Sequence, residues 1–340
     1  MKVTSESSMR LYRELVERPQ EAPAAYAPSR RSSFYRVGGR ESVALVRCCD
    51  RRRGILEALR LLGGIEPLVR RVGGEIILKP NCNTDDPYPR DTHPDTVKAL
   101  AEALIEAGAK PRQIVVGDMS GRARGLPTRA TIENLGIRDV ADELGLQLAY
   151  FEEEPWVRVK PSEAVHWPEG FVIPRRVHEA ERIILTPILR SHSTATFTCA
   201  MKLGVGLIDA RCREWLHNGE DHFGKLIEIN SAYSVDLVVA DALRMNTGYG
   251  TDAADEVSPG VIIAGGSPVA CDAVSAAIMR HYGTVRVKDK PVKAHDQFLH
   301  AQRIKLGSPS LRDIDLRTSD LVGDESFLTL ISHVKNELED

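Results

Sequence analysis

A segment near the middle of the chain combines residue types that transfer protons and bind anions. It runs from Arg190 to His217, reads RSHSTATFTCAMKLGVGLIDARCREWLH, and follows an apolar run that predicts a buried strand. Polar, glycine-bearing segments after buried strands commonly form the sites of α/β proteins. Lys202 lies here in an apolar, Ala/Gly-rich setting, where a lysine pairs with a carboxylate or faces an anionic ligand. Burial would also lower its pKa and permit proton transfer.

Other predicted strands also end in polar residues. Ligands of open α/β sheets bind outside the carboxyl ends of the strands, so we expect these side chains to converge. The catalytic candidates are Lys202, His217, His93 and Asp241. Lys202 would transfer protons, His217 and His93 would transfer protons or bind a metal, and Asp241 would orient a histidine or complete the metal shell. Cationic and polar side chains clamp carboxylates and phosphates. The residues assigned to substrate binding are Lys79, Asn81, Arg190, Arg211 and Ser120.

Histidines of the same region offer metal ligands. His192 and His217, together with Asp118 from another strand end, would form a mononuclear site of the two-histidine, one-carboxylate kind. The candidate divalent metals are iron, manganese, zinc and nickel, and metal-free acid–base roles are the alternative. The remaining histidines outside this region have no supporting neighbours, so we expect surface or packing roles for His166, His178, His281, His295, His300 and His333.

Structural roles are the alternative for three of the candidates. His93 precedes Pro94 at a predicted helix start, where it would serve as an N-cap. Asp118 would cap a turn. Asp241 would accept hydrogen bonds from backbone amides of the following loop, MNTGYG.

Composition excludes several classes of protein. The formal net charge of −3 over 340 residues gives no basic field for nucleic acid. No apolar run approaches the roughly 20 residues of a membrane span. The segment SRRSSFYRV lacks the apolar region of an export signal, and six cysteines without a C-x-x-C pair predict neither disulfides nor an Fe–S cluster. Neither a Walker A sequence nor a dinucleotide fingerprint is present, so no ATP or NAD site is expected. We therefore expect a cytoplasmic protein with a small anionic substrate and no nucleic-acid or membrane partner.

Strand and helix patterns alternate from Ser42 onward. This alternation predicts an α/β protein with a mainly parallel sheet or sheets flanked by helices, in Rossmann-like halves. Residues 1–40 are expected to be an N-terminal extension, with a helix from Met9 to Glu17 and then a Pro/Ala/Ser-rich linker. The α/β domain would cover residues 41–325, with a sub-domain split near 155–175, and residues 326–340 would be a C-terminal tail. The sequence is also compatible with a homo-oligomer.

Ordered motifs between about residues 42 and 320 resemble the DUF362 family, a domain of unknown function. The matching positions are Lys79-Pro80-Asn81, His93-Pro94, Gly117-Asp118, Lys202 with Gly206, Arg211 and His217, Asp241-Ala242 to Gly250, and Gly266 to Asp272. The resemblance implies an α/β fold with a site built from the matched residues, and it supplies no reaction. Leu203 stands where many members have asparagine, and the chain lacks the ferredoxin-like module that many members carry.

These observations lead to three hypotheses of function. The first is an enzyme acting on a small carboxylate- or phosphate-bearing molecule, by redox chemistry at a bound metal or by metal-assisted hydrolysis or lyase chemistry. The second is a non-catalytic protein that binds a metal, a cofactor or a small anion. The third is an interaction protein whose residues 1–40 dock a partner.

Overall fold

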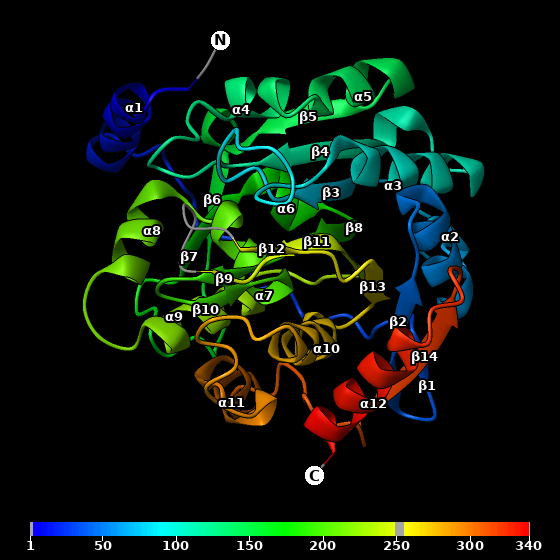
Figure 1. The fold of residues 1–340 in the computed structure, drawn as a ribbon. Helices are drawn as coiled ribbons and strands as arrows, with labels where there is room; N and C mark the ends of the chain where they lie inside the picture. Colours follow the sequence, from blue (N-terminus) through cyan, green and yellow to red (C-terminus); the bar gives the residue numbers. More distant parts are fainter. Residues whose placement is uncertain (1–2, 249–254, 340) are drawn as a thin grey trace.

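One twelve-stranded sheet with helices on both faces forms the body of the protein (Figure 1). The computed structural model describes residues 3–248 and 255–339. The strands are β1 (Arg36–Val37), β2 (Arg40–Arg47), β3 (Ile76–Pro80), β4 (Ile114–Asp118), β5 (Gln147–Tyr150), β6 (Trp156–Val159), β7 (Phe171–Pro174), β8 (Arg182–Thr186), β9 (Ile188–His192), β10 (Thr196–Thr198), β11 (Leu237–Asn246), β12 (Glu256–Val257), β13 (Val261–Gly265) and β14 (Ile314–Asp320). This architecture confirms the predicted α/β class.

The helices connect these strands and cover the sheet. They are α1 (Ser5–Glu17), α2 (Arg51–Leu62), α3 (Pro94–Glu106), α4 (Thr128–Asn134), α5 (Ile137–Leu144), α6 (Arg175–Glu179), α7 (Ala200–Leu203), α8 (Ala210–His217), α9 (His222–Glu228), α10 (Pro268–His281), α11 (Asp296–Arg303) and α12 (Ser326–Leu338). Short 3-10 helices are η1 (Glu66–Leu68), η2 (Pro111–Gln113), η3 (Phe151–Glu153), η4 (Gly204–Leu207), η5 (Ile229–Ser231) and η6 (Val292–Ala294).

The main path through the sheet follows the order β1-β2-β13-β11-β8-β3-β4-β5. Strands β11, β8, β3, β4 and β5 are parallel to one another, whereas β13 is antiparallel to both of its neighbours. Strand β9 pairs in parallel with the end of β11 and carries the antiparallel strand β10. One sheet thus runs through both predicted halves, and the region expected to divide them contains the separate hairpin of β6 and β7.

Two apolar cores, one on each face of the sheet, hold the layers together. Ile77 and Val115 face the core that α10, α11 and α12 cover, and their neighbours Ile76 and Ile114 face the core under α2, α3 and α5. Successive side chains of a strand point to opposite faces. Because both faces are covered, the central strands read as continuous apolar runs rather than as alternating patterns.

The N-terminal extension packs on the rest of the protein. Helix α1 begins at Ser5, one turn before the predicted start, because the side chain of Thr4 caps it. The buried Tyr12 donates its hydroxyl hydrogen bond to α8, with the oxygen 2.9 Å from Oε1 of Glu214. Further along, Arg31 forms an ion pair of 2.6 Å with the buried Asp236.

Two strand predictions differ from the structure. The run from Arg182 to Arg190 was expected to form one strand, but Pro187 divides it into β8 and β9, because proline has no N–H group for the ladder. Asp241 was expected at a strand end, but β11 continues past it to Asn246. The polar end of β11 therefore lies at Asn246 and not at Asp241.

The last residues of the chain, expected to be a tail, contain helix α12. Phe327, Leu330, Val334 and Leu338 are buried on one side of this helix. These apolar positions recur at helical spacing, and the helix packs against α10 in the core of that face.

The cysteines form no disulfide, and all six are free thiols, with Cys49 the exposed one. Within the described ranges, no helix combines the length and the apolar character needed to cross a membrane.

The packing of α12 can be tested with a matched pair of leucines. Leu330→Ala removes a side chain that is 2% exposed, and we expect it to lower the free energy of unfolding by about 2–5 kcal/mol. Leu328→Ala removes a side chain that is 67% exposed, and we expect a change within about 0.5 kcal/mol. Urea denaturation measures both, and equal losses would contradict a packed C-terminal helix.

Candidate functional site

Lys202 lies on a short helix whose start is fixed by a buried carboxylate. Helix α7 follows β10, and Asp272 of α10 accepts hydrogen bonds from the backbone N–H groups of Ala200 at 2.7 Å and Met201 at 3.0 Å. A carboxylate on the first amides of a helix satisfies groups that have no partner within the helix. Asp272, which sequence motifs placed only at a helix start, thus anchors the segment that carries the lysine.

The Lys202 amine has positive neighbours and no carboxylate partner. Its side chain is partly buried, and it makes no hydrogen bond or ion pair with any residue that the structure describes. Burial, followed by the charges of Arg190, Arg213 and Lys79, lowers its pKa to about 7. At neutral pH both its protonated and its neutral forms are populated, as proton transfer requires.

Arg190 lies in β9 and is the second unpaired cation. It is buried, and its Nε has no hydrogen-bond partner among the described residues. Burial lowers its pKa, and Asp91 opposes this effect from a distance. The oxygens of Asp91 accept hydrogen bonds from Asn81, Asn83 and Thr84 instead, so the guanidinium remains free for a ligand.

The strands on either side of Arg190 also present polar groups without partners. Thr198 of β10 and Asn246 of β11 are its register partners in the sheet. Oγ1 of Thr198 and both amide atoms of Asn246 are buried and make no hydrogen bond within the described ranges. Buried polar atoms are nearly always paired, and an unpaired one costs about 1–3 kcal/mol. Three orphaned groups on adjacent strands are typical of a ligand-binding surface.

Three histidines near this surface are held neutral. Burial lowers the pKa of His217 to about 4 and that of His192 far below its ordinary value, and Lys202 adds to both shifts. The rings of His217 and His222 stack with centroids 5.7 Å apart. Nδ1 of His222 lies 3.2 Å from the Leu216 carbonyl and donates to it, so Nε2, which is buried and unpaired, carries the lone pair. We call Lys202, Arg190, Thr198, Asn246 and these three histidines the anion site.

A buried ion pair lies near the anion site, and the charge of its lysine acts on Lys202. Nζ of Lys79 lies 2.7 Å from Oδ1 of Asp118, and both side chains are almost fully buried. A β-carbon at Gly206 of η4 would lie 2.2 Å from that carboxylate oxygen, so only glycine allows this close approach. Arg213 donates to the carbonyls of Met119 and Ser120, each at 2.6 Å. Lys79 and Asp118, predicted to bind substrate and metal, are thus paired with each other.

Other predicted site residues lie elsewhere. The side chain of Asn81 donates to Asp91 at 2.8 Å. Ser120 is buried and its own carbonyl accepts from Arg213, while its Oγ has no hydrogen-bond partner among the described residues. Arg211 is exposed and donates to the carbonyl of Val16 in α1. The inward-facing arginine of α8 is therefore Arg213, two positions later.

His93 and Asp241 lie apart from the anion site, in the surroundings of Arg51. His93 is the N-cap of α3, which is the structural role predicted as its alternative. Its Nδ1 accepts a hydrogen bond from the backbone N–H of Asp95 at 3.1 Å. Asp241 is fully buried and accepts from Arg51 at 2.5 Å and from Tyr88 at 2.6 Å. Asp241 is thus paired with Arg51 and Tyr88, and none of its hydrogen bonds within the described ranges comes from a histidine of the anion site.

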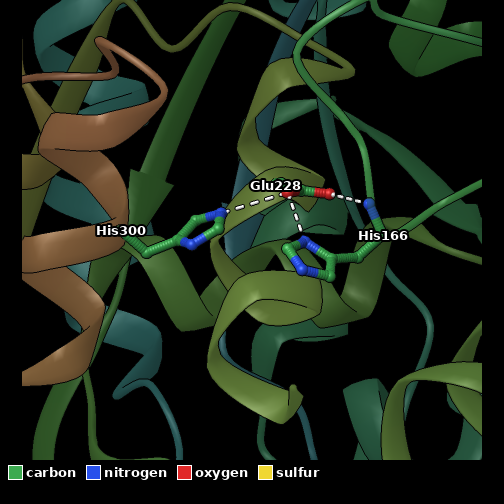
Figure 2. Close-up of side chains that lie close together, drawn as sticks. All are labelled: His166, Glu228 and His300. Carbon is green, nitrogen blue, oxygen red and sulfur yellow. Dashed lines mark hydrogen bonds and ion pairs between the residues drawn. The ribbon is translucent and has the colours of Figure 1, made fainter. Parts of the chain in front are cut away.

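The predicted metal ligands do not come together in the part of the chain that the structure describes. His192, His217 and Asp118 do not form a group of ligand atoms within 4.8 Å of one another. The group that does so contains His166, Glu228 and His300 (Figure 2). The expectation that His166 and His300 lack supporting neighbours is therefore wrong, because both contact the same buried carboxylate. The predicted glycine-rich loop to Gly250 continues outside the described residues.

Comparison with known proteins identifies the family. The fold and the site define an α/β protein in which a lysine and an arginine near the strand ends have no partner among the described residues. A family model matches residues 76–277. The chain belongs to this family, which is described as a domain of unknown function, DUF362. A curated relative, the thylakoid-associated protein sll1697 of Synechocystis sp., is 28% identical over 254 residues, 71% of this chain and 75% of its own.

A solved structure shows a weaker likeness. The lactate racemase apoprotein from Thermoanaerobacterium thermosaccharolyticum aligns with 75% of this chain at 14% identity and a TM-score of 0.44. This chain spans 62% of the length of that structure.

The buried ion pair near the anion site can be tested through stability. We expect Lys79→Met to lower the free energy of unfolding by about 3–5 kcal/mol, because Asp118 would keep a buried charge without its partner. Lys98→Met, which breaks the exposed pair with Glu143, is the matched control and should leave stability unchanged. Urea denaturation checks both, and a mild effect of Lys79→Met would show that the pair does not hold the two strands.

Proposed function

We propose that this protein is an enzyme that binds a small carboxylate- or phosphate-bearing molecule at the anion site and uses Lys202 for proton transfer. The observation that carries the proposal is the pair of unpartnered cations, Lys202 and Arg190, with orphaned buried polar atoms on the strands beside Arg190. Arg190 would clamp the anion through its planar fork of donors. Thr198 and Asn246 would supply neutral hydrogen bonds.

The protonation states support acid–base chemistry at Lys202. A pKa of about 7 lets its neutral amine accept a proton from a bound substrate and its ammonium form return one. Burial lowers the pKa values of His217 and His222, so both stay neutral at pH 7 and Lys202 is a stronger base than His217. An anion bound beside Lys202 stabilises the ammonium form, so ligand binding is coupled to proton uptake.

The sequence also leads us to predict metal-dependent redox chemistry at this site. The positions of the described donor atoms do not support a metal ion there. The histidines here are neutral and chemically suited to a transition metal. The described ligand atoms do not gather within 4.8 Å of one another, so no step is assigned to a metal at the anion site. The cytoplasmic location likewise stays a prediction, and the curated relative bears the name thylakoid-associated.

Sulfate, a dianion at all pH values used, tests the site. Lys202 is half charged near pH 7 and loses its charge above it, so affinity should be highest at the acidic end of the range and should fall by up to about tenfold per pH unit well above pH 7. Lys202→Met should weaken binding and abolish the pH dependence. Titration calorimetry between pH 6 and pH 8.5 measures both, with Arg211→Gln as the control cation. Equal affinity across this range, or an equal effect of Arg211→Gln, would refute the site.

Turnover separates an enzyme from a binding protein. The wild type and Lys202→Met are incubated with a mixture of small carboxylates and phosphate esters, and mass spectrometry follows each compound. Consumption by the wild type alone would support catalysis by Lys202. Sulfate binding without consumption of any compound would favour the non-catalytic alternative.

Asn246 provides an independent test through stability. Because neither amide atom has a partner, we expect Asn246→Leu to leave the free energy of unfolding unchanged or to raise it by about 1 kcal/mol. The same change should weaken sulfate binding. Urea denaturation and calorimetry measure the two effects, and a marked loss of stability would mean that the amide serves the fold instead of a ligand.

A further inference from the structure

A second cluster of ligating side chains lies outside the anion site, where three segments distant in sequence meet. His166 comes from the connection between β6 and β7, Glu228 ends α9, and His300 lies in α11 (Figure 2). Glu228 is fully buried, the side chain of His300 is 5% exposed, and that of His166 is 25% exposed. The cluster is therefore mostly shielded but can be reached from solvent through His166.

The three side chains converge on one carboxylate oxygen. Oε1 of Glu228 lies 2.6 Å from Nδ1 of His166 and 3.1 Å from Nε2 of His300. The other oxygen accepts the backbone N–H of His166 at 2.9 Å, which fixes the plane of the carboxylate. Oε1 of Glu228 thus faces both imidazole rings, and a cation placed among the three would contact this oxygen directly.

A further carboxylate orients His166. Nε2 of this ring lies 2.7 Å from Oδ2 of Asp221, the N-cap of α9. A histidine that binds a metal through one nitrogen commonly donates its other N–H to a carboxylate, which fixes the tautomer and the ring. His166, held between Glu228 on Nδ1 and Asp221 on Nε2, has this arrangement before any ion enters.

We propose that His166, Glu228 and His300 bind a divalent transition-metal ion, with Asp221 as the carboxylate that positions His166. Two imidazole nitrogens and one carboxylate oxygen are the donor set of zinc, iron(II), manganese and cobalt sites. Donors around a tetrahedral ion lie roughly 3.4 Å apart, given bonds of about 2.1 Å. The observed 2.6 and 3.1 Å therefore require each pair to open by less than about 1 Å, as the ion replaces the protons of the two hydrogen bonds.

The ion would join three parts of the chain and leave a coordination position for water or a ligand. It would tie the β6–β7 connection to α9 and α11. This site is separate from the anion site, so the two proposals can fail independently.

The alternative is a hydrogen-bonded cluster that needs no ion, and metal titration distinguishes the two. Full-length protein is stripped with a chelator and titrated with Zn²⁺ and Co²⁺ by calorimetry and visible absorption. We expect one equivalent to bind. Glu228→Gln and His300→Gln should weaken binding by more than about 100-fold, and Asp221→Asn by about 10–100-fold.

Two histidine variants serve as controls. His178→Gln removes a partly exposed histidine that contacts the carbonyl and the ring of Tyr26, and His217→Gln removes one from the anion site. Both should bind one equivalent with unchanged affinity. Loss of the metal in His217→Gln, or unchanged binding in both Glu228→Gln and His300→Gln, would overturn the proposal.

A measurement on the wild type covers the case in which the cluster variants do not fold. X-ray absorption of the zinc-loaded protein should show two histidine nitrogens and at least one oxygen in the first shell. A shell with no histidine or with three histidines would overturn the assignment, as would the absence of Zn²⁺ and Co²⁺ binding at millimolar concentration.

Discussion

Buried positive charge is the constraint on which the polar edge of this sheet depends. A cation removed from water needs a counter-charge or a full set of hydrogen bonds. Lys79 has Asp118, Arg51 has Asp241, and Arg213 has three backbone carbonyls. These pairs fix strands β3, β4 and β11 and the helices above them. They provide the rigid frame in which two further cations, Lys202 and Arg190, have no hydrogen-bond or ion-pair partner in residues 3–248 and 255–339.

Most of the fold could be predicted from local patterns, because its signals are local. Apolar runs identified the central strands, Gly63 ended α2 as a left-handed C-cap, and Pro94 opened α3. Strand limits were less accurate because they depend on pairing. Pro187 interrupts a run that is apolar on both sides, and β11 extends past Asp241 because β9 is available as a neighbour.

The site was predicted in part, because side-chain direction and sheet register are not local. Lys202 was identified from its apolar surroundings and Arg190 from its place at the end of an apolar run. Arg211 and Arg213 have the same type and nearly the same position, and only helix orientation places one outside and the other inside. Thr198 and Asn246 join the site through strand pairing alone. His166 and His300 lie 62 and 72 residues from Glu228, so no spacing could reveal their cluster.

The two sites have opposite electrostatic character although one short helix reaches both. Helix α9 begins with His222 of the anion site and ends with Glu228, and its N-cap Asp221 contacts His166. At one site, lysine and arginine meet neutral histidines, so the local charge is positive and an anion is the ligand that balances it. At the other, two carboxylates flank two histidines, so a cation balances the charge. Because charge balance selects the ligand in each case, neither site is suited to the ion of the other, and the histidines divide accordingly between proton transfer and metal ligation.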